Sequence, residues 1–298
     1  MRIFVTGATG FVGEAVVREL LAAGHSVLGL ARSDAGADTL TRLGAAVHRG
    51  DLLDTAGLAE GAKACDGVIH LAFIHDFSRF KENCEIDRGV IAALGGALAG
   101  SDRPLVVTSG TGLLSSTRIV TEEDMPQSGP NAVPRIASEE AAAALVARGV
   151  NASIMRLPPT VHGDGDHGFV PMLIALAREK GVSAYVGEGL NRWPAVHRFD
   201  AAQAFRLALE KGVAGARYHA VAEEGVAFRD IASVIGQRLN VPVVSKNGAD
   251  VAGHFGWFAH FAGMDNLASS QRTRELLGWE PKQIGLIADL DRPPYFEG

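Results

Sequence analysis

The chain has 298 residues, 47% of them apolar, which is enough for one large domain or for one domain with a smaller lobe. Its net charge of -6, without a basic stripe, argues against nucleic acid as the main partner, and no apolar run reaches membrane length. The two cysteines, Cys65 and Cys84, indicate neither a disulfide framework nor a zinc site. The chain starts directly in a strand without a secretion signal, so we expect a cytoplasmic protein.

The first residues predict a strand, a glycine-rich turn and a helix. An apolar run over 2–5 is followed by Thr-Gly-Ala-Thr-Gly-Phe-Val-Gly at 6–13, with three glycines at a three-residue spacing. In this pattern Gly7 permits the tight turn, Gly10 lets the backbone approach a pyrophosphate, and Gly13 lets the helix pack closely on the strand. The pattern predicts a dinucleotide site at the helix N-terminus. The alternative is a tight glycine turn in an ordinary strand-helix unit.

The second strand indicates which dinucleotide is bound. A helix over 14–23 ends at Gly24, and a strand over 25–30 completes a strand-helix-strand unit. A carboxylate at the end of this strand would bind the ribose 2′-hydroxyl of NAD, but this chain has Ala31-Arg32-Ser33 there. A guanidinium and a hydroxyl suit a 2′-phosphate, so we expect NADP(H). The alternative for Arg32 is a solvated loop cation.

Strands and helices continue to alternate through the first half of the chain. The runs at 46–48, 67–72, 104–108 and 151–157 predict further strands, with a helix from about 135 to 148. We therefore expect an α/β fold with a Rossmann-type doubly wound parallel sheet.

After Pro158 the pattern loosens into a polar loop, several helices and one short strand. The loop covers 162–168, the helices cover 170–180, 200–211 and 228–239, and the strand covers 217–221. We expect an NADP(H)-binding domain over 1–160, to which 194–222 return, and a small C-terminal substrate lobe. That lobe is formed by 161–193 and 223–298 and lies over the strand ends, where such sheets bind ligands.

These motifs resemble the extended or atypical branch of the short-chain dehydrogenase/reductase superfamily, which contains nucleotide-sugar epimerases and dehydratases. The resemblance covers nearly the whole chain and includes the segments 6–13, 50–52, 70–72, 107–109, 157–163, 196–200 and 277–281. This resemblance, together with the interpretation of the glycine turn and of the end of the second strand, implies a set of residues that contact the cofactor. They are Gly7, Thr9, Gly10, Phe11, Val12, Gly13, Arg32, Ser33, Asp51, Leu52, Leu71, Ala72, Phe73, Thr108, Leu157 and Pro158.

One departure from this family affects the chemistry. The family has a Tyr and a Lys four residues apart at the start of the helix after the Ser strand, where the Tyr exchanges a proton and the Lys lowers its pKa. Aligning Ser138 with the family's usual Ser places Arg135 at the Tyr position and Glu139 at the Lys position. An Arg is not a general acid near neutral pH. We expect Arg135 and Glu139 to form an ion pair on the helix surface.

The missing pair disfavours some reactions more than others. Sugar epimerisation and dehydration begin by oxidising an alcohol, which requires a base, whereas ketone reduction needs a hydride and one proton. A few atypical members that reduce polyketide-type aromatic ketones resemble this pattern. We expect an NADPH-dependent ketoreductase acting on a large, fairly apolar, aromatic or polyketide-like molecule. The alternatives are an NADP(H)-binding sensor or interaction protein without catalysis, and a nucleotide-sugar epimerase or dehydratase.

Three residues are candidates for contact with the reacting carbonyl. Ser109 ends the strand that carries the family's Ser or Thr, and Thr111 lies two residues later; either hydroxyl could bind a carbonyl oxygen or merely close the turn. His75 follows the cofactor-facing segment and titrates in a range suited to proton transfer, although a loop histidine is more often solvated.

The second half of the chain contributes the candidates for substrate contact, which are His162, Phe169, Trp193 and Trp257. The loop His162-Gly-Asp-Gly-Asp-His167 contains metal-ligand residue types, but its glycines argue against a metal site. We expect Asp200 to cap the helix after His197. Aromatic residues over 255–264 have the spacing of a buried helix face, and their flanking glycines also allow a lid over a flat substrate. The oligomeric state stays open.

Overall fold

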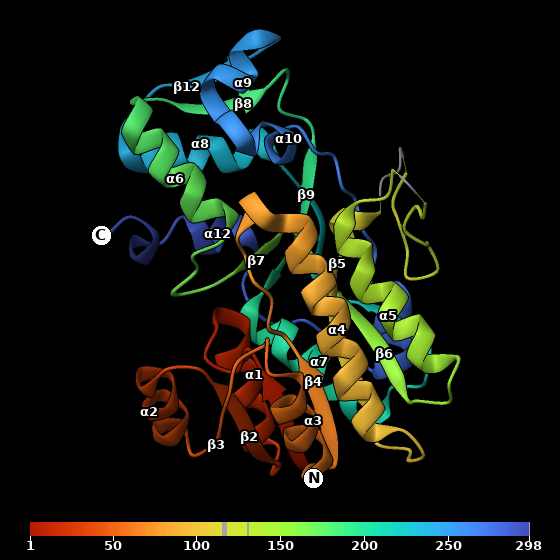
Figure 1. Ribbon diagram of the computed structural model, residues 1–298. Coiled ribbons are helices and arrows are strands. Elements are labelled where there is room, and N and C mark those ends of the chain that lie inside the picture. The colour runs from red at the N-terminus through yellow and green to blue at the C-terminus, as the bar shows by residue number, and fades with distance from the viewer. Residues whose placement is uncertain (115–117, 130, 298) are drawn as a thin grey trace.

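The computed structural model describes residues 1–114, 118–129 and 131–297, and its centre is a seven-stranded sheet (Figure 1). Every neighbouring pair in this sheet is parallel. In spatial order the strands are β10 (Arg217–His219), β6 (Ala152–Leu157), β5 (Leu105–Gly110), β4 (Gly67–His70), β1 (Arg2–Thr6), β2 (Ser26–Ala31) and β3 (Ala46–Arg49). The order reverses between β1 and β4, which is where such sheets bind ligands. The predicted Rossmann-type fold is confirmed.

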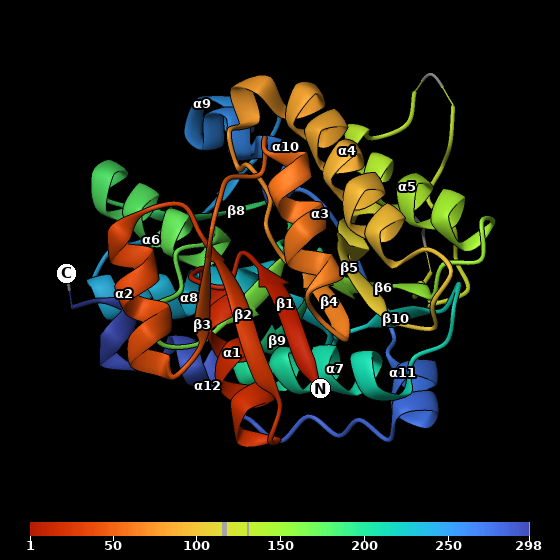
Figure 2. The same ribbon diagram turned by 60° about the horizontal axis from the view of Figure 1, so that its bottom comes forward.

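Helices cover both faces of the sheet, as Figure 2 shows. One face packs against α1 (Phe11–Ala22), α2 (Asp34–Leu43) and α7 (Arg198–Lys211), through apolar side chains such as Leu20 and Phe205. The other face packs against α3 (Thr55–Lys63), α4 (Phe80–Leu98) and α5 (Ala137–Val146), through side chains such as Leu58 and Leu94. Within the described ranges, no helix is long and apolar enough to cross a membrane.

A smaller lobe lies beyond the carboxyl ends of the central strands (Figure 1). It has its own apolar core around Trp193, Phe228 and Phe258. Its strands are β7 (Thr160–His162), β9 (Arg192–His197) and β11 (Glu223–Ala227) in one sheet, and β8 (Ser183–Val186) and β12 (Val243–Lys246) in another. Its helices are α6 (Phe169–Lys180), α8 (Phe228–Leu239), α9 (Ala249–Phe255), α10 (Ala259–Ala262) and α12 (Leu286–Leu290). The segment 194–222 divides, because β9 joins the sheet of the lobe while α7 and β10 lie on the central sheet.

Two segments differ locally from the sequence-based expectation. The helix expected from about 135 begins as a 3₁₀ turn, Pro134–Ile136, before α5 starts at Ala137. The aromatic segment 255–264 is not one helix, because α9 ends before Gly256, whose φ is 55° and which begins a 3₁₀ turn that precedes α10. The remaining short helix, α11 (Gln271–Leu277), packs against α7 and β10.

Candidate active site

The turn between β1 and α1 is shaped by glycines that leave room only for backbone. Gly7 has φ 67°, and a Cβ there would lie 2.7 Å from the amide nitrogen of Ala72. A Cβ on Gly13 would lie 1.8 Å from the Gly7 carbonyl oxygen. The N–H of Gly10 closes the turn by donating to the Gly7 carbonyl at 2.9 Å, and the first bond of α1 is donated by Glu14 to the Gly10 carbonyl at 2.8 Å. The N–H groups at the start of a helix, here those of 11–13, point towards the site of an anion. This cradle fits the pyrophosphate of a nicotinamide dinucleotide.

The polar loop after β7 lies against the same helix start. The ring of Phe11, the first residue of α1, lies 5.8 Å edge-on from the ring of His167. The guanidinium of Arg198 lies 4.9 Å from the centre of the Phe11 ring and donates to the carbonyl of Asp164 at 3.0 Å. The loop over 163–168 therefore borders the cradle, although it comes from a distant part of the sequence.

Arg32 and Ser33 follow the carboxyl end of β2, and Thr9 of the glycine turn lies near them. The side chain of Arg32 is 84% exposed and lies 3.9 Å from the carboxylate of Asp51. Ser33 caps α2 by accepting the N–H of Gly36 at 3.2 Å. A Cβ on Gly36 would lie 3.3 Å from the methyl group of Thr9, so Thr9 and Ser33 are adjacent. Arg32 is thus free to reach a ligand, while Asp51 introduces a competing negative charge.

A chain of buried polar groups leads from this cradle to α5. His70, at the end of β4, bonds through Nδ1 to Thr6 at 2.7 Å and through Nε2 to Asp87 Oδ1 at 2.9 Å. The other oxygen of Asp87 accepts from Ser138 at 2.5 Å and from Arg135 at 2.8 Å. Burial alone would raise the pKa of Asp87, but the adjacent His70, Arg135 and Ser138 outweigh it and lower that pKa.

The prediction that Arg135 and Glu139 form an ion pair on the helix surface is wrong, because each pairs with a different residue. Glu139 is 5% exposed and forms a two-bond ion pair with the fully buried Arg156, with both N–O distances 2.8 Å. Arg135 instead pairs with Asp87 and also donates to the carbonyl of Thr108 at 3.2 Å. The prediction failed because Arg135 precedes α5 in a 3₁₀ turn, and because the first three residues of α5, which include Glu139, are buried.

The predicted carbonyl contacts lie at the ends of β4 and β5. Ser109 is buried and donates its hydroxyl hydrogen to Glu139 at 2.7 Å. Thr111 is fully buried and donates to the side-chain oxygen of Asn266 at 2.8 Å. His75 has a solvent-exposed side and lies 5.2 Å edge-on from Phe73. Partial desolvation and the nearby charge of Arg135 lower the pKa of His75.

Aromatic side chains of the central domain and of the smaller lobe contact one another near Arg135. Phe73 lies under the guanidinium of Arg135, whose central carbon is 4.2 Å from the ring centre. Phe77 stacks on Trp257 of the lobe with centroids 5.3 Å apart, and Trp257 remains 58% exposed. Trp193 is fully buried beside Phe169 in the core of the lobe. The segment 255–264 therefore contributes both to the core, through Phe255 and Phe258, and to this exposed aromatic surface.

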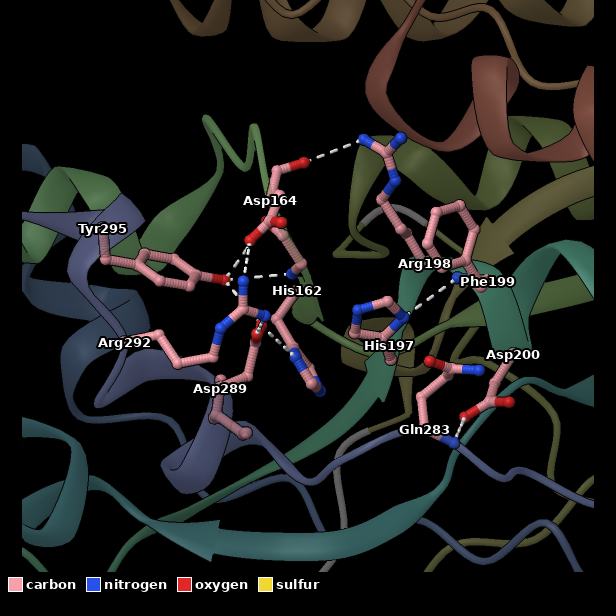
Figure 3. Close-up of polar contacts among 12 residues, drawn as sticks. His162, Asp164, His197, Arg198, Phe199, Asp200, Gln283, Asp289, Arg292 and Tyr295 are labelled. Atoms are coloured by element: carbon pink, nitrogen blue, oxygen red, sulfur yellow. Dashed lines mark hydrogen bonds and ion pairs between the residues drawn. The ribbon is translucent and has the colours of Figure 1, made fainter. Parts of the chain in front are cut away.

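A second polar cluster joins the loop after β7 to the C-terminal residues (Figure 3). Asp289 accepts from Tyr295 at 3.2 Å and lies 2.8 Å from His162 Nδ1 and 2.7 Å from Arg292. Arg292 also pairs with Asp164, and Tyr295 receives the N–H of Gly163 at 3.0 Å. Within the described part of the chain, no group of three or more His, Cys, Asp or Glu residues is arranged to hold a metal ion. This cluster anchors the loop that borders the cradle.

The expected role of Asp200 as a helix cap is also wrong. The ring of His197 caps α7 by accepting the N–H of Phe199 at 3.3 Å. The carboxylate of Asp200 instead accepts the backbone N–H of Lys282 at 2.9 Å. It also accepts the N–H of Gln283 at 3.0 Å (Figure 3). The sequence did not show this role, because its partners lie more than 80 residues away.

The model of the NAD dependent epimerase/dehydratase family matches residues 3–222, and the chain belongs to that family. An uncharacterized protein of Schizosaccharomyces pombe is 51% identical, over 99% of this chain and 100% of its own. The 4-hydroxy-2-methyl-3-oxo-4-farnesyl-3,4-dihydroquinoline-1-oxide ketoreductase of Stigmatella aurantiaca is 26% identical, over 86% of this chain and 80% of its own. Among solved structures, a nucleoside-diphosphate-sugar epimerase from Pseudomonas aeruginosa has a TM-score of 0.79 at 20% identity, covering 97% of this chain and 95% of that one.

These findings confirm the resemblance inferred from the motifs. The family and its oxidoreductase members support an enzyme that uses a nicotinamide cofactor on a small-molecule substrate. The buried groups around Asp87 and Arg156 are what the sequence analysis missed. Their signal was present in the sequence. Asp87 shares a helix face with the buried residues Cys84, Ile91 and Leu94, His70 ends an apolar strand, and Arg156 lies inside one.

Proposed function

We propose that this protein is an NADPH-dependent carbonyl reductase for a fairly large, apolar ketone, aromatic or polyketide-like in character. The observation that carries the proposal is that ion-paired residues, Arg135 and Glu139, occupy the two positions at which the family has its Tyr and Lys. Arg135 is paired with Asp87, and Glu139 is paired with Arg156. Neither position offers the base with which oxidation of a sugar hydroxyl begins.

The three tyrosines of the chain lie elsewhere and do not replace the missing base. The hydroxyl of Tyr218 accepts the N–H of Val213 at 3.3 Å, and burial raises its pKa. Tyr295 bonds to Asp289 in the C-terminal cluster, and Tyr185 belongs to β8 in the lobe. Reduction has lower demands, because it needs a positioned carbonyl, a hydride and one proton.

In the proposed site, each residue has a defined task. The three glycines would hold the pyrophosphate of NADPH, and the nicotinamide of that cofactor would supply the hydride. Ser109 turns its hydroxyl from Glu139 to the carbonyl oxygen, and His75 borders the same space. Thr111, which is committed to Asn266, holds the turn in place. The exposed rings of Phe77 and Trp257 offer an apolar wall for the substrate.

NADP(H) is the proposed cofactor because Arg32 and Ser33 follow β2, and a guanidinium and a hydroxyl at the end of this strand suit a 2′-phosphate. The ketoreductase of Stigmatella aurantiaca, whose name specifies a large, farnesyl-bearing ketone, supports the proposed substrate class.

The test is a panel of aromatic and aliphatic ketones with NADPH or NADH, followed by the absorbance of the reduced nicotinamide. We expect loss of NADPH with bulky aromatic ketones. Tight NADPH binding without turnover on any ketone would favour a sensor. Interconversion of sugar nucleotides without net cofactor loss would favour an epimerase.

A further inference from the structure

Arg135 is held by an ion pair with Asp87, yet its side chain is not fully buried. Arg135 lies in a 3₁₀ turn beside β5, and its guanidinium donates to the carbonyl of Thr108 at 3.2 Å. One face of the guanidinium lies over Phe73, yet the side chain remains 17% exposed. We infer that Arg135 binds the carbonyl oxygen of the substrate and stabilises the alkoxide that forms there, an inference that rests on the proposed reductase function.

The guanidinium of Arg135 has N–H donors that its contacts with Asp87, Ser138 and Thr108 do not use. Arginine carries five N–H groups in one plane. Nη1 binds Asp87 Oδ2 at 2.8 Å and also contacts the hydroxyl of Ser138, and Nη2 uses one hydrogen on Thr108. Among the residues that the structure describes, the Nε–H and the second Nη2 hydrogen have no hydrogen-bond acceptor. Because these donors lie in the plane, stacking on Phe73 does not consume them.

The buried polar chain fixes Arg135 relative to the glycine cradle. Asp87 links Arg135 to His70, and His70 bonds to Thr6. The hydroxyl of Thr6 also accepts the N–H of Ala72 at 3.3 Å, and Ala72 is the residue against which Gly7 packs. The lowered pKa of Asp87 keeps this carboxylate ionised near neutral pH, so the guanidinium keeps its anchor. A carbonyl beside the nicotinamide would thus meet donors with a preset position.

The step balances without a dedicated acid. Hydride adds to the carbonyl carbon, the electron pair of the C=O bond moves to oxygen, and NADPH is oxidised to NADP⁺. The resulting alkoxide accepts hydrogen bonds from Arg135, which keeps all its protons. Water then protonates the alkoxide, and the buffer neutralises the hydroxide. Arg135 acts through its charge, which explains how the site functions with Arg in place of Tyr.

The test uses 4-nitrophenol as a probe of oxyanion binding in the full chain saturated with NADP⁺. Phenol and phenolate absorb differently, so a pH titration gives the affinity of each form without any turnover. We expect the wild type to bind phenolate at least tenfold more tightly than phenol, and Arg135→Met to lose this preference. Arg88→Met is the matched control, because it removes an arginine of α4, one residue after Asp87, that pairs with Glu140 of α5 on the surface.

A second variant guards against misfolding, because Arg135→Met leaves Asp87 without its cation. Arg135→Met/Asp87→Asn removes both charges; its circular dichroism shows whether it is folded, and the folded variant should lack the phenolate preference. Guanidinium ions should restore the preference to Arg135→Ala. Equal phenolate preference in the wild type and in the folded Arg135 variants overturns the inference. Failure of every ketone to be reduced would instead overturn the proposed function, since the probe assay needs no reaction.

Discussion

Removal of the Glu139 carboxylate gives the sharpest test of how the site is built. In Glu139→Ala the fully buried Arg156 loses both of its 2.8 Å ion-pair bonds and keeps only neutral partners, the Asp124 carbonyl at 3.0 Å and His219 at 3.2 Å. Breaking a buried pair from one side costs about 3–5 kcal/mol, because an uncompensated charge stays buried. We expect the free energy of unfolding to fall by about that amount.

Urea unfolding at pH 7, followed by circular dichroism, measures this loss, and two variants set the scale. Glu140→Ala removes the neighbouring carboxylate, which is exposed and pairs with Arg88, and should cost less than about 1 kcal/mol. Glu139→Ala/Arg156→Met removes both buried charges and should recover most of the loss. A cost below about 1 kcal/mol for Glu139→Ala would refute the buried pair and restore the surface pair expected from the sequence.

Three further predictions concern the cofactor and the buried titratable groups. Arg32→Ala should weaken NADPH binding by roughly 1.5–3 kcal/mol in calorimetry and leave NADH nearly unchanged; equal wild-type affinities for the two would contradict the cofactor assignment. Burial raises the pKa of Asp166 from 3.8 to about 6, so the fold loses stability as the pH rises through this interval. Asp166→Asn should therefore add on the order of 1–3 kcal/mol to the unfolding free energy at pH 8 and almost nothing at pH 3, and the same gain at both would contradict the shift. Burial lowers the pKa of His219 to about 4, so wild-type stability should fall as the pH drops from about 6.5 towards 4, and His219→Gln should flatten that slope in unfolding curves.

The central sheet and the glycine cradle were predictable because their signals are local. Apolar runs of strand length alternate with helical stretches, and the spacing of the first three glycines specifies the turn in which they lie. The structure adds the reason for that spacing, since a side chain on Gly13 would overlap the carbonyl of Gly7.

The polar interior of the site was not predictable in the same way. Arg135 and Glu139 have the spacing of a helix-surface pair, and only the packing of α5 on α4 and the central sheet shows that each takes a different, buried partner. Asp87 and Arg156 are 48 and 17 residues from those partners. Local spacing carries no information about contacts of this kind, whereas a charged residue on an apolar helix face or inside an apolar strand does signal a buried partner.

The central claim, that the protein reduces a ketone without the Tyr and Lys of its family, is tested most directly by following the hydride. NADPH deuterated at both positions of C4 is incubated with the protein and a bulky aromatic ketone, and the product is analysed by mass spectrometry and NMR. We predict one deuterium at the alcohol carbon for each NADPH consumed. Absence of labelled alcohol across the ketone panel, together with epimerisation of a sugar nucleotide without net NADPH loss, would contradict the claim.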